Sequence, residues 1–273
     1  MLTILNSISS LNAENALSST QASLQKTLSQ LSTGLRVNSG SDDAAGLSIA
    51  DNLQANIAAL TQSSNNASDG VGLLQTADGA LSQVTTMLNR AVTLATEASN
   101  GGLSTSQAAA LQNEYTSIQS EIDSIGTTTN YNGTAVFGSD STVFTSDGTS
   151  TGSATIDTSV GDLSSASLGL TSSGDPLETT SGATAELALL SKAISTIAAD
   201  RGTIGATVNQ LNDAANVQST ETTNLQSAVN NIKDADVGQT VSQMTQYSVL
   251  EQTGMAALSQ SNQIQQNVLK LLQ

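Results

Sequence analysis

Residues 17–35, LSSTQASLQKTLSQLSTGL, repeat leucine with the spacing of a coiled-coil seam. The repeated positions are Leu17, Leu24, Leu28, Leu31 and Leu35. Steps of three, four and seven residues keep side chains on one face of an α-helix, as the a and d positions of a heptad do. The stretch therefore predicts a helix that packs its leucine face against a second helix. A break is expected at residues 38–40, Asn-Ser-Gly.

The run SGSDDAAGLSIAD, residues 39–51, begins a second helical pattern. Its two adjacent acids suit either an acidic chemical site or a helix start. Ser41 is a good N-cap, and carboxylates in the first turn suit the free N–H groups and the positive end of the helix dipole. A glycine in that turn leaves room for another backbone. We therefore predict a capped domain junction that comprises Ser41, Asp42, Asp43 and Gly46.

Helical periodicity continues over residues 44–95, through two Asp-Gly pairs, 69–70 and 78–79, that we expect to interrupt it. Asn-Gly-Gly at 100–102 ends this segment. A further apolar stripe at 108–125 predicts another helix, which stops at the glycine that follows it.

Residues 127–183 are dense in Ser, Thr, Gly and Asp. Short β-prone runs, TAVF, STVFT and SATIDTSV, alternate with turn signals at Asn132-Gly133 and Asp147-Gly148. We predict a small β-hairpin element and a loop that ends near Pro176. The Ser and Thr side chains of 139–183 suit O-glycan acceptors and equally a plain solubilising loop.

Residues 184–273 return to helical periodicity. The final stretch places apolar side chains in one heptad register, at Val237, Val241, Met244, Met255, Leu258, Leu269 and Leu272. The polar residues that interrupt this register are Ser248, Glu251, Asn262 and Gln265. A seam broken in this way needs several neighbours or faces water over part of its length. Because both chain ends carry heptad-like seams, we predict that they pair with each other and pack against other molecules.

The composition excludes several function classes. The chain has 23 acidic and 7 basic residues and a net charge of −16, which disfavours nucleic-acid binding and anionic membrane surfaces. It has no His and no Cys, so the usual general base and the imidazole and thiolate metal ligands are missing. No apolar run approaches the ~20 residues of a membrane span. We expect no enzyme, no cofactor, no metal site and no membrane insertion.

These patterns predict a mainly α fold. A long helical hairpin or coiled coil of the N- and C-terminal helices joins a helical bundle domain with a small β-hairpin element.

Several long motifs resemble those of bacterial flagellin. In the N-terminal half they are NSISSLNAENAL, LSTGLRVNSGSDDAAGLSIAD, MLNRAVTLATEASNG and YNGTAVF, and at the other end NIKDADVGQTVSQMTQYSVLEQTGMAALSQSNQIQQNVLKLLQ. The resemblance covers nearly all of residues 1–137 and 185–273, and the middle is shorter than in large flagellins. It implies a short flagellin, a structural subunit that self-assembles into the extracellular flagellar filament for motility. The domains it implies are a terminal coiled-coil domain (1–43 and 235–273), an inner helical bundle domain (44–137 and 184–234) and a Ser/Thr/Gly-rich hairpin and loop region (138–183), with no large outer domain.

The resemblance also implies partners. They are other copies of the chain, the flagellar export apparatus and a chaperone, the filament cap and the hook-junction proteins. Family members are exported unfolded and polymerise at the distal tip, where paired terminal helices line the central channel. From the heptad spacing shared by both chain ends, we predict an assembly seam in which leucines of the N-terminal helix pack against the C-terminal helix. Its residues are Leu24, Leu28, Leu31, Leu35, Met255, Leu258, Leu269 and Leu272.

A host innate immune receptor is a further partner that the resemblance suggests. Arg90, Leu94 and Glu114 match the family's receptor-contact positions, whereas Val92 and Thr93 stand where strongly recognised flagellins carry a charged pair. A plain surface ion pair of Arg90 is the competing interpretation.

Two other functions remain open on sequence alone. A hook–filament junction protein would share the terminal helices but occur in few copies. A secreted helical adhesin would need a binding pocket with stacking aromatic side chains, and the chain has only two Phe and three Tyr.

Overall fold

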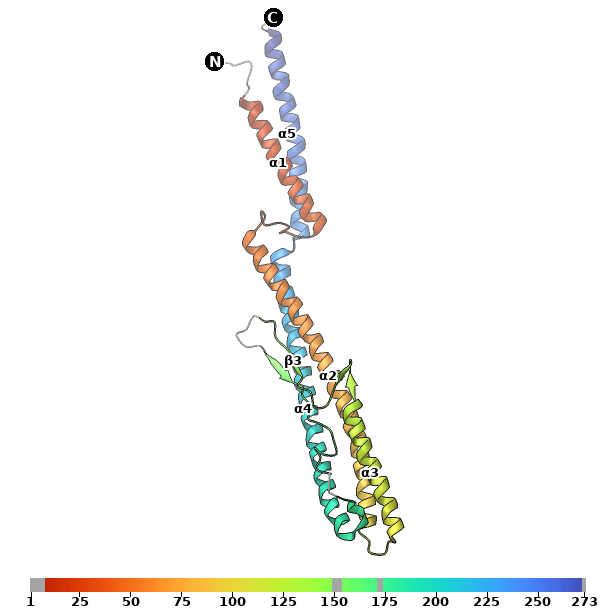
Figure 1. The fold of residues 1–273 in the computed structure, drawn as a ribbon. Helices are drawn as coiled ribbons and strands as arrows, with labels where there is room; N and C mark the ends of the chain where they lie inside the picture. Colours follow the sequence, from red (N-terminus) through yellow and green to blue (C-terminus); the bar gives the residue numbers. More distant parts are fainter. Residues whose placement is uncertain (1–7, 149–153, 171–173, 272–273) are drawn as a thin grey trace. The chain divides into compact units, whose positions relative to one another are not determined.

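Five helices dominate the computed structural model, which describes residues 8–148, 154–170 and 174–271 (Figure 1). They are α1 (Ile8–Thr33), α2 (Ala44–Ala98), α3 (Thr105–Thr128), α4 (Thr180–Lys233) and α5 (Val237–Leu271). Antiparallel pairing joins β1 (Asn130–Tyr131) to β2 (Thr134–Ala135), and β3 (Thr142–Phe144) to β4 (Thr155–Asp157). A 3-10 turn, η1 (Pro176–Glu178), precedes α4. The predicted mainly α fold is confirmed, and the expected hairpin element is two small ribbons.

The chain forms two compact units. The terminal unit contains the described residues of 1–55 and 224–273, and the central unit contains those of 56–223. Helices α2 and α4 each contribute to both units. The domain limits predicted at 43–44 and 234–235 stay a prediction.

Helices α1 and α5 lie side by side in the terminal unit (Figure 1). The less exposed row of α1 follows steps of three and four residues, at Ala13, Leu17, Thr20, Leu24, Thr27 and Leu31. Thr27 is the most buried of these residues, at 3% exposure. Its hydroxyl donates to the carbonyl of Ser23, so the polar group is satisfied inside the seam. The heptad seam therefore alternates leucine with small or hydroxylated side chains.

Polar and small residues also form the α5 side of this seam. The Ser10 and Ser261 hydroxyls lie 2.8 Å apart, and the Gln21 amide donates to the Glu251 carboxylate at 3.2 Å. Gly254 lets α1 approach, because a Cβ there would meet Leu17 at 3.3 Å. A seam of this composition buries little apolar surface, so the helix pair gains little stability from burial within one chain.

The segment after α1 is tied to the connection between α4 and α5. The Arg36 amide donates to the Lys233 carbonyl, and the Ala235 amide donates to the Gly34 carbonyl. The Arg36 guanidinium also donates to the Ile232 carbonyl at 2.8 Å, which satisfies an acceptor in the last turn of α4. These bonds join the N-terminal segment of the terminal unit to its C-terminal segment.

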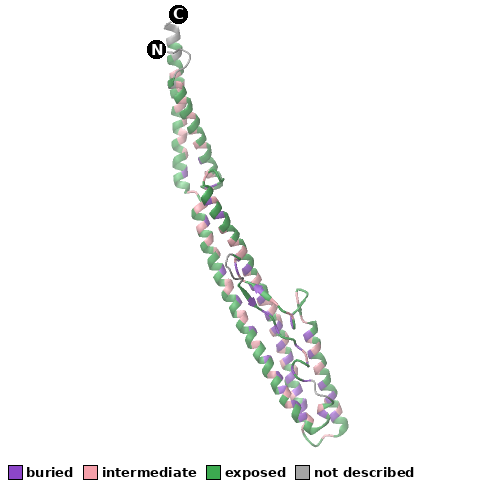
Figure 2. Cartoon of the chain, turned by 60° about the vertical axis from the view of Figure 1, so that its left-hand side comes forward, coloured by how far each residue is buried: buried purple, intermediate pink, exposed green. Residues whose placement is uncertain are grey.

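Apolar side chains of α2, α3 and α4 form the core of the central unit, where Figure 2 shows most of the buried residues. Helix α2 contributes a buried row at Ala67, Leu74, Ala77, Leu81, Val84, Leu88 and Ala91. Its alternation of small and large side chains lets neighbouring helices interdigitate. Val143 of β3, Ile156 of β4 and Leu177 of η1 complete this core.

The expected interruptions of α2 at 69–70 and 78–79 are wrong, because the helix is continuous from Ala44 to Ala98. Gly70 is a packing position instead, since a Cβ there would lie 2.6 Å from Val143 Cγ2. Gly72 meets the Tyr131 ring in the same way, with a Cβ 2.7 Å from its hydroxyl. These glycines let the ribbons lie close to the helix.

Candidate assembly surface

Large apolar side chains remain exposed mainly on the terminal unit. Of the twelve that the described residues leave strongly exposed, ten belong to this unit, and the two others are Phe144 and Val217. The ten are Ile8, Leu11, Leu28, Ile49, Val237, Val241, Val249, Leu250, Met255 and Ile264. Some of them share one side of a helix, as Ile8 and Leu11 of α1 and Val237 and Val241 of α5 do, and exposed apolar patches mark interaction sites. The terminal unit therefore presents faces suited to burial against other molecules.

The predicted assembly seam divides between two environments. Leu24, Leu31, Leu35 and Leu258 are partly buried within the chain. Leu28 and Met255 are 47% and 49% exposed, so they face outward from the chain's own helix pair. The Leu269 side chain and Leu272 lie outside the described residues. Thr27 and Gly254 occupy the inner positions that the sequence assigned to Leu28 and Met255.

The start of α2 is capped by Asp43, and the predicted N-cap at Ser41 is wrong. The helix begins at Ala44, and the Gly46 amide donates to Asp43 Oδ1 at 2.9 Å. An N-cap side chain that accepts from the third helical residue is the usual arrangement. The Ser41 hydroxyl pairs instead with that of Ser39, at 2.8 Å. Gly46 is buried, and a Cβ there would meet both Asp43 and Ile232, so close approach at this glycine does occur.

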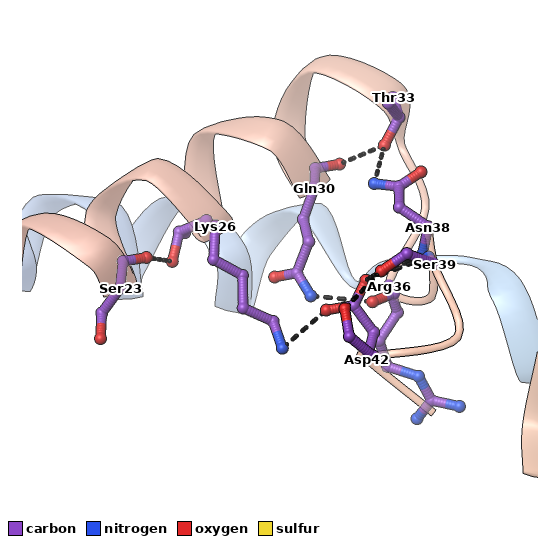
Figure 3. Close-up of polar contacts among 10 residues, drawn as sticks. Ser23, Lys26, Gln30, Thr33, Arg36, Asn38, Ser39 and Asp42 are labelled. Atoms are coloured by element: carbon purple, nitrogen blue, oxygen red, sulfur yellow. Dashed lines mark hydrogen bonds and ion pairs between the residues drawn. The ribbon is translucent and has the colours of Figure 1, made fainter. Parts of the chain in front are cut away.

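Asp42 organises the loop before α2, as Figure 3 shows. Lys26 Nζ of α1 lies 2.8 Å from its Oδ1, and the amides of Asn38 and Ser39 donate to its Oδ2, each at 3.2 Å. The bond to Lys26, with help from the Asn38 amide, lowers the pKa of Asp42 to about 2. The acid pair is therefore structural: Asp42 holds the loop, and Asp43 starts the helix.

This geometry predicts how the loop responds to acid. The pKa of Asp42 in the folded protein lies below the ordinary value of 3.8. The ionised carboxylate therefore contributes to folding stability above about pH 4, and this contribution is lost as the pH falls toward 2. The carboxyl ¹³C shift of Asp42 should titrate with a midpoint near 2. Lys26→Met should move this midpoint upward toward 3.8. The same midpoint in both proteins would contradict the assigned role of Lys26.

The predicted receptor patch is only partly at the surface. Arg90 Nε lies 2.7 Å from Glu114 Oε1, and their side chains are 55% and 44% exposed. The pairing lowers the pKa of the Glu114 carboxyl and raises that of Arg90. Leu94 is fully buried in the core of the central unit, so it offers no surface there. The bridge joins α2 to α3, which fits the ion-pair interpretation.

One buried polar contact was not predicted from the sequence. The Tyr115 hydroxyl of α3 donates to Glu186 Oε1 of α4, and both residues are 1% exposed. Burial and the neighbouring carboxylate raise the pKa of Tyr115, so the hydroxyl stays protonated and donates. A single acidic residue on an apolar helix face could have indicated it.

Comparisons with known proteins match most of the chain to bacterial flagellins. The family model described as bacterial flagellin N-terminal helical region matches residues 4–142, and that of the bacterial flagellin C-terminal helical region matches residues 187–272. Flagellin of Bacillus subtilis is 31% identical over 98% of this chain and 98% of its own. The flagellar filament 33 kDa core protein of Treponema phagedenis is 30% identical, again over 98% of both chains.

A crystal structure of Bacillus cereus flagellin is 30% identical, with a TM-score of 0.49 over 56% of this chain and 88% of that one. None of the described helices is long and apolar enough to span a membrane. The two family matches, together with the relatives that match over nearly their whole length, establish the family of this chain. The chain belongs to the bacterial flagellin family, whose members are structural subunits of the extracellular flagellar filament that serves motility, not enzymes.

Proposed function

We propose that the exposed faces of α1 and α5 form the contacts by which this subunit polymerises. One observation carries the proposal: ten of the twelve strongly exposed large apolar side chains of the described residues lie in the terminal unit. A monomer gains nothing from displaying them, because each contributes about 1.5 to 3 kcal/mol only when it is buried. Burial against neighbouring subunits supplies that free energy.

The composition of the α1–α5 seam supports the same proposal. Thr27, Gly254 and the hydroxyls of Ser10 and Ser261 occupy inner positions, while Leu28 and Met255 lie outside. Within one chain, the helix pair therefore has a mixed inner side of leucines and polar or small residues, and it leaves other large apolar side chains exposed. This arrangement suits a helix pair that gains its main packing from other copies.

We also propose that the chain uses the partners of its family: the export apparatus and a chaperone, the filament cap and the hook-junction proteins. The absence of cysteine supports passage in an unfolded state, since no disulfide has to break. For an innate immune receptor, the exposed Arg90 and Glu114 are the candidate contacts, without Leu94.

Leu250→Asp tests the proposed assembly surface. Leu250 is 45% exposed on α5, and a carboxylate there would be buried unpaired in a polymer contact. We expect it to abolish filament growth at concentrations where the unmodified chain polymerises, while the monomer keeps its helical circular dichroism. Electron microscopy and sedimentation would measure both. Gln252→Asp adds the same charge at an exposed position on another side of α5 and should still polymerise. Normal filaments from Leu250→Asp would contradict the proposal.

A further inference from the structure

A groove of about 680 Å³ lies in the central unit, between the β3–β4 ribbon and the outer face of α4. Its α4 side consists of Gln210, Asp213, Ala214, Val217, Gln218 and Glu221. The ribbon side includes Asp147 and Ile156. No basic residue lines it. The groove therefore joins three carboxylates to apolar surface.

Gln218 gives this groove an unused hydrogen-bond acceptor. The residue is 4% exposed, and its Nε2 donates to Ser63 Oγ and to the Thr145 carbonyl, each at 2.9 Å. Its Oε1 is buried and has no hydrogen-bond partner among the described residues. A buried acceptor without a donor costs stability, so this wall of the groove is not fully satisfied within one chain.

Val217 supplies the apolar part of the groove. It is 64% exposed, more than any other large apolar side chain described in the central unit. Acceptors beside exposed apolar surface match a lysine side chain, which has an apolar stem and three N–H donors at its tip. The described residues contain no cluster of acidic side chains with the spacing of a metal site, which favours an organic cation.

Among the side chains that the structure describes, one lysine is a candidate cation. Four of its seven basic residues pair with carboxylates: Lys26, Arg90, Arg201 and Lys233. Arg36 donates to carbonyls of α4, and the Lys270 side chain lies outside the described residues. Lys192 is exposed on α4 and forms no ion pair with any described residue.

Lys192 lies on the same face of α4 as the groove residues Gln210 and Val217, but nearer the start of the helix. Gln210 and Val217 follow it by 18 and 25 residues, which are close to five and seven turns of 3.6 residues. At about 1.5 Å per residue, Lys192 lies about 30 to 45 Å from Asp213 and Glu221 along the helix. The lysine therefore cannot reach the groove of its own chain.

We propose that Lys192 of one subunit docks in the acidic groove of the next subunit. Because cation and groove are different surfaces, the contact is heterologous and repeats from copy to copy into an open polymer. Each docking also offsets part of the repulsion between subunits of net charge −16. The inference rests on the proposed polymerisation and assigns one of its contacts to the central unit.

Charge reversal tests the contact. Lys192→Glu should raise the critical concentration for polymerisation about five- to tenfold at low salt, because an attraction becomes a repulsion. Glu221→Lys alone should also raise it. The double variant, with both changes in every subunit, pairs opposite charges again at these two positions. Because Asp147 and Asp213 stay in the groove, it should lower the critical concentration below that of either single variant without full restoration. The matched control is Asp69→Lys, the same charge change at an exposed position of α2 outside the groove.

Sedimentation at about 0.05 M and about 0.5 M salt would measure these values, and the differences should shrink at the higher salt. Circular dichroism of the monomers shows whether each variant keeps its helices. An unchanged critical concentration for Lys192→Glu, or a double variant no better than the single ones, would overturn the contact. Either result leaves polymerisation through α1 and α5 intact, whereas unmodified chains that never polymerise would overturn the proposed function itself.

Discussion

Gly126→Ala is expected to destabilise the central unit by about 3 kcal/mol, although alanine is the better helix former. Gly126 lies in the last turn of α3, where a Cβ would overlap the backbone carbonyl of Leu163. The crossing segment cannot move aside cheaply. The Ser165 amide and hydroxyl both donate to the Asp123 carboxylate, at 2.6 and 3.0 Å, one turn before the glycine. Relief of the overlap would break these bonds or uncover Leu163, which is 4% exposed.

The matched control is the same substitution in an open helix position. Gly79 lies inside α2, and a Cβ there would meet no atom within 4 Å. Gly79→Ala should therefore stabilise the protein, by up to about 1 kcal/mol, through helix propensity alone. Chemical denaturation of both variants would measure the free energies of unfolding. Equal values for the two would show that the Leu163 contact does not restrict residue 126.

Gly70 and Gly79 show why the sequence predicted the path of α2 poorly. Asp-Gly pairs are turn signals in most contexts, and local propensity gives no other information at 69–70 and 78–79. The helix continues because its buried row supplies packing on both sides of each pair, which outweighs about 1 kcal/mol per glycine. Gly70 is required by Val143, some seventy residues away, and no local pattern reports such a contact.

The heptad pattern located the helices correctly but not all of their inner residues. Between Leu24 and Leu31, a helical row can pass through Leu28, with steps of four and three, or through Thr27, with steps of three and four. The spacing alone does not distinguish the two. Hydrophobicity favours Leu28, yet the structure buries Thr27 and exposes Leu28. The threonine is tolerated inside because its hydroxyl donates a hydrogen bond to the Ser23 carbonyl. Burial of Leu28 against a second subunit would be a contact between chains, which a pattern within one chain does not indicate.

The helix start near residue 44 was predictable, but its capping residue was not. Ser41, Asp42 and Asp43 are all common N-cap residues, so composition alone leaves the choice open. The ion pair with Lys26 keeps the Asp42 carboxylate in the loop, which leaves Asp43 as the residue that caps α2. Lys26 belongs to α1, so the cap depends on a tertiary contact.

Tyr115→Phe is the second substitution with a large expected effect, a loss of about 3 kcal/mol from the central unit. The phenyl ring fills nearly the same space, so packing is retained. What disappears is the hydroxyl that donates to Glu186 Oε1, and the buried carboxylate is left with one donor fewer. A buried group that can be charged loses more from a missing donor than a neutral one does.

A double-mutant cycle separates this contact from general damage to the core. Glu186→Leu removes the acceptor and replaces it with an apolar side chain, so the later loss of the Tyr115 hydroxyl should cost little. We expect Tyr115→Phe in that background to cost about 2 kcal/mol less than in the unmodified chain. Glu186→Gln keeps an acceptor oxygen and should be milder than Glu186→Leu. Additive losses in urea denaturation would mean that the hydroxyl and the carboxylate are not coupled. A clear coupling would show that the bond between α3 and α4 supplies stability beyond that of the surrounding apolar core.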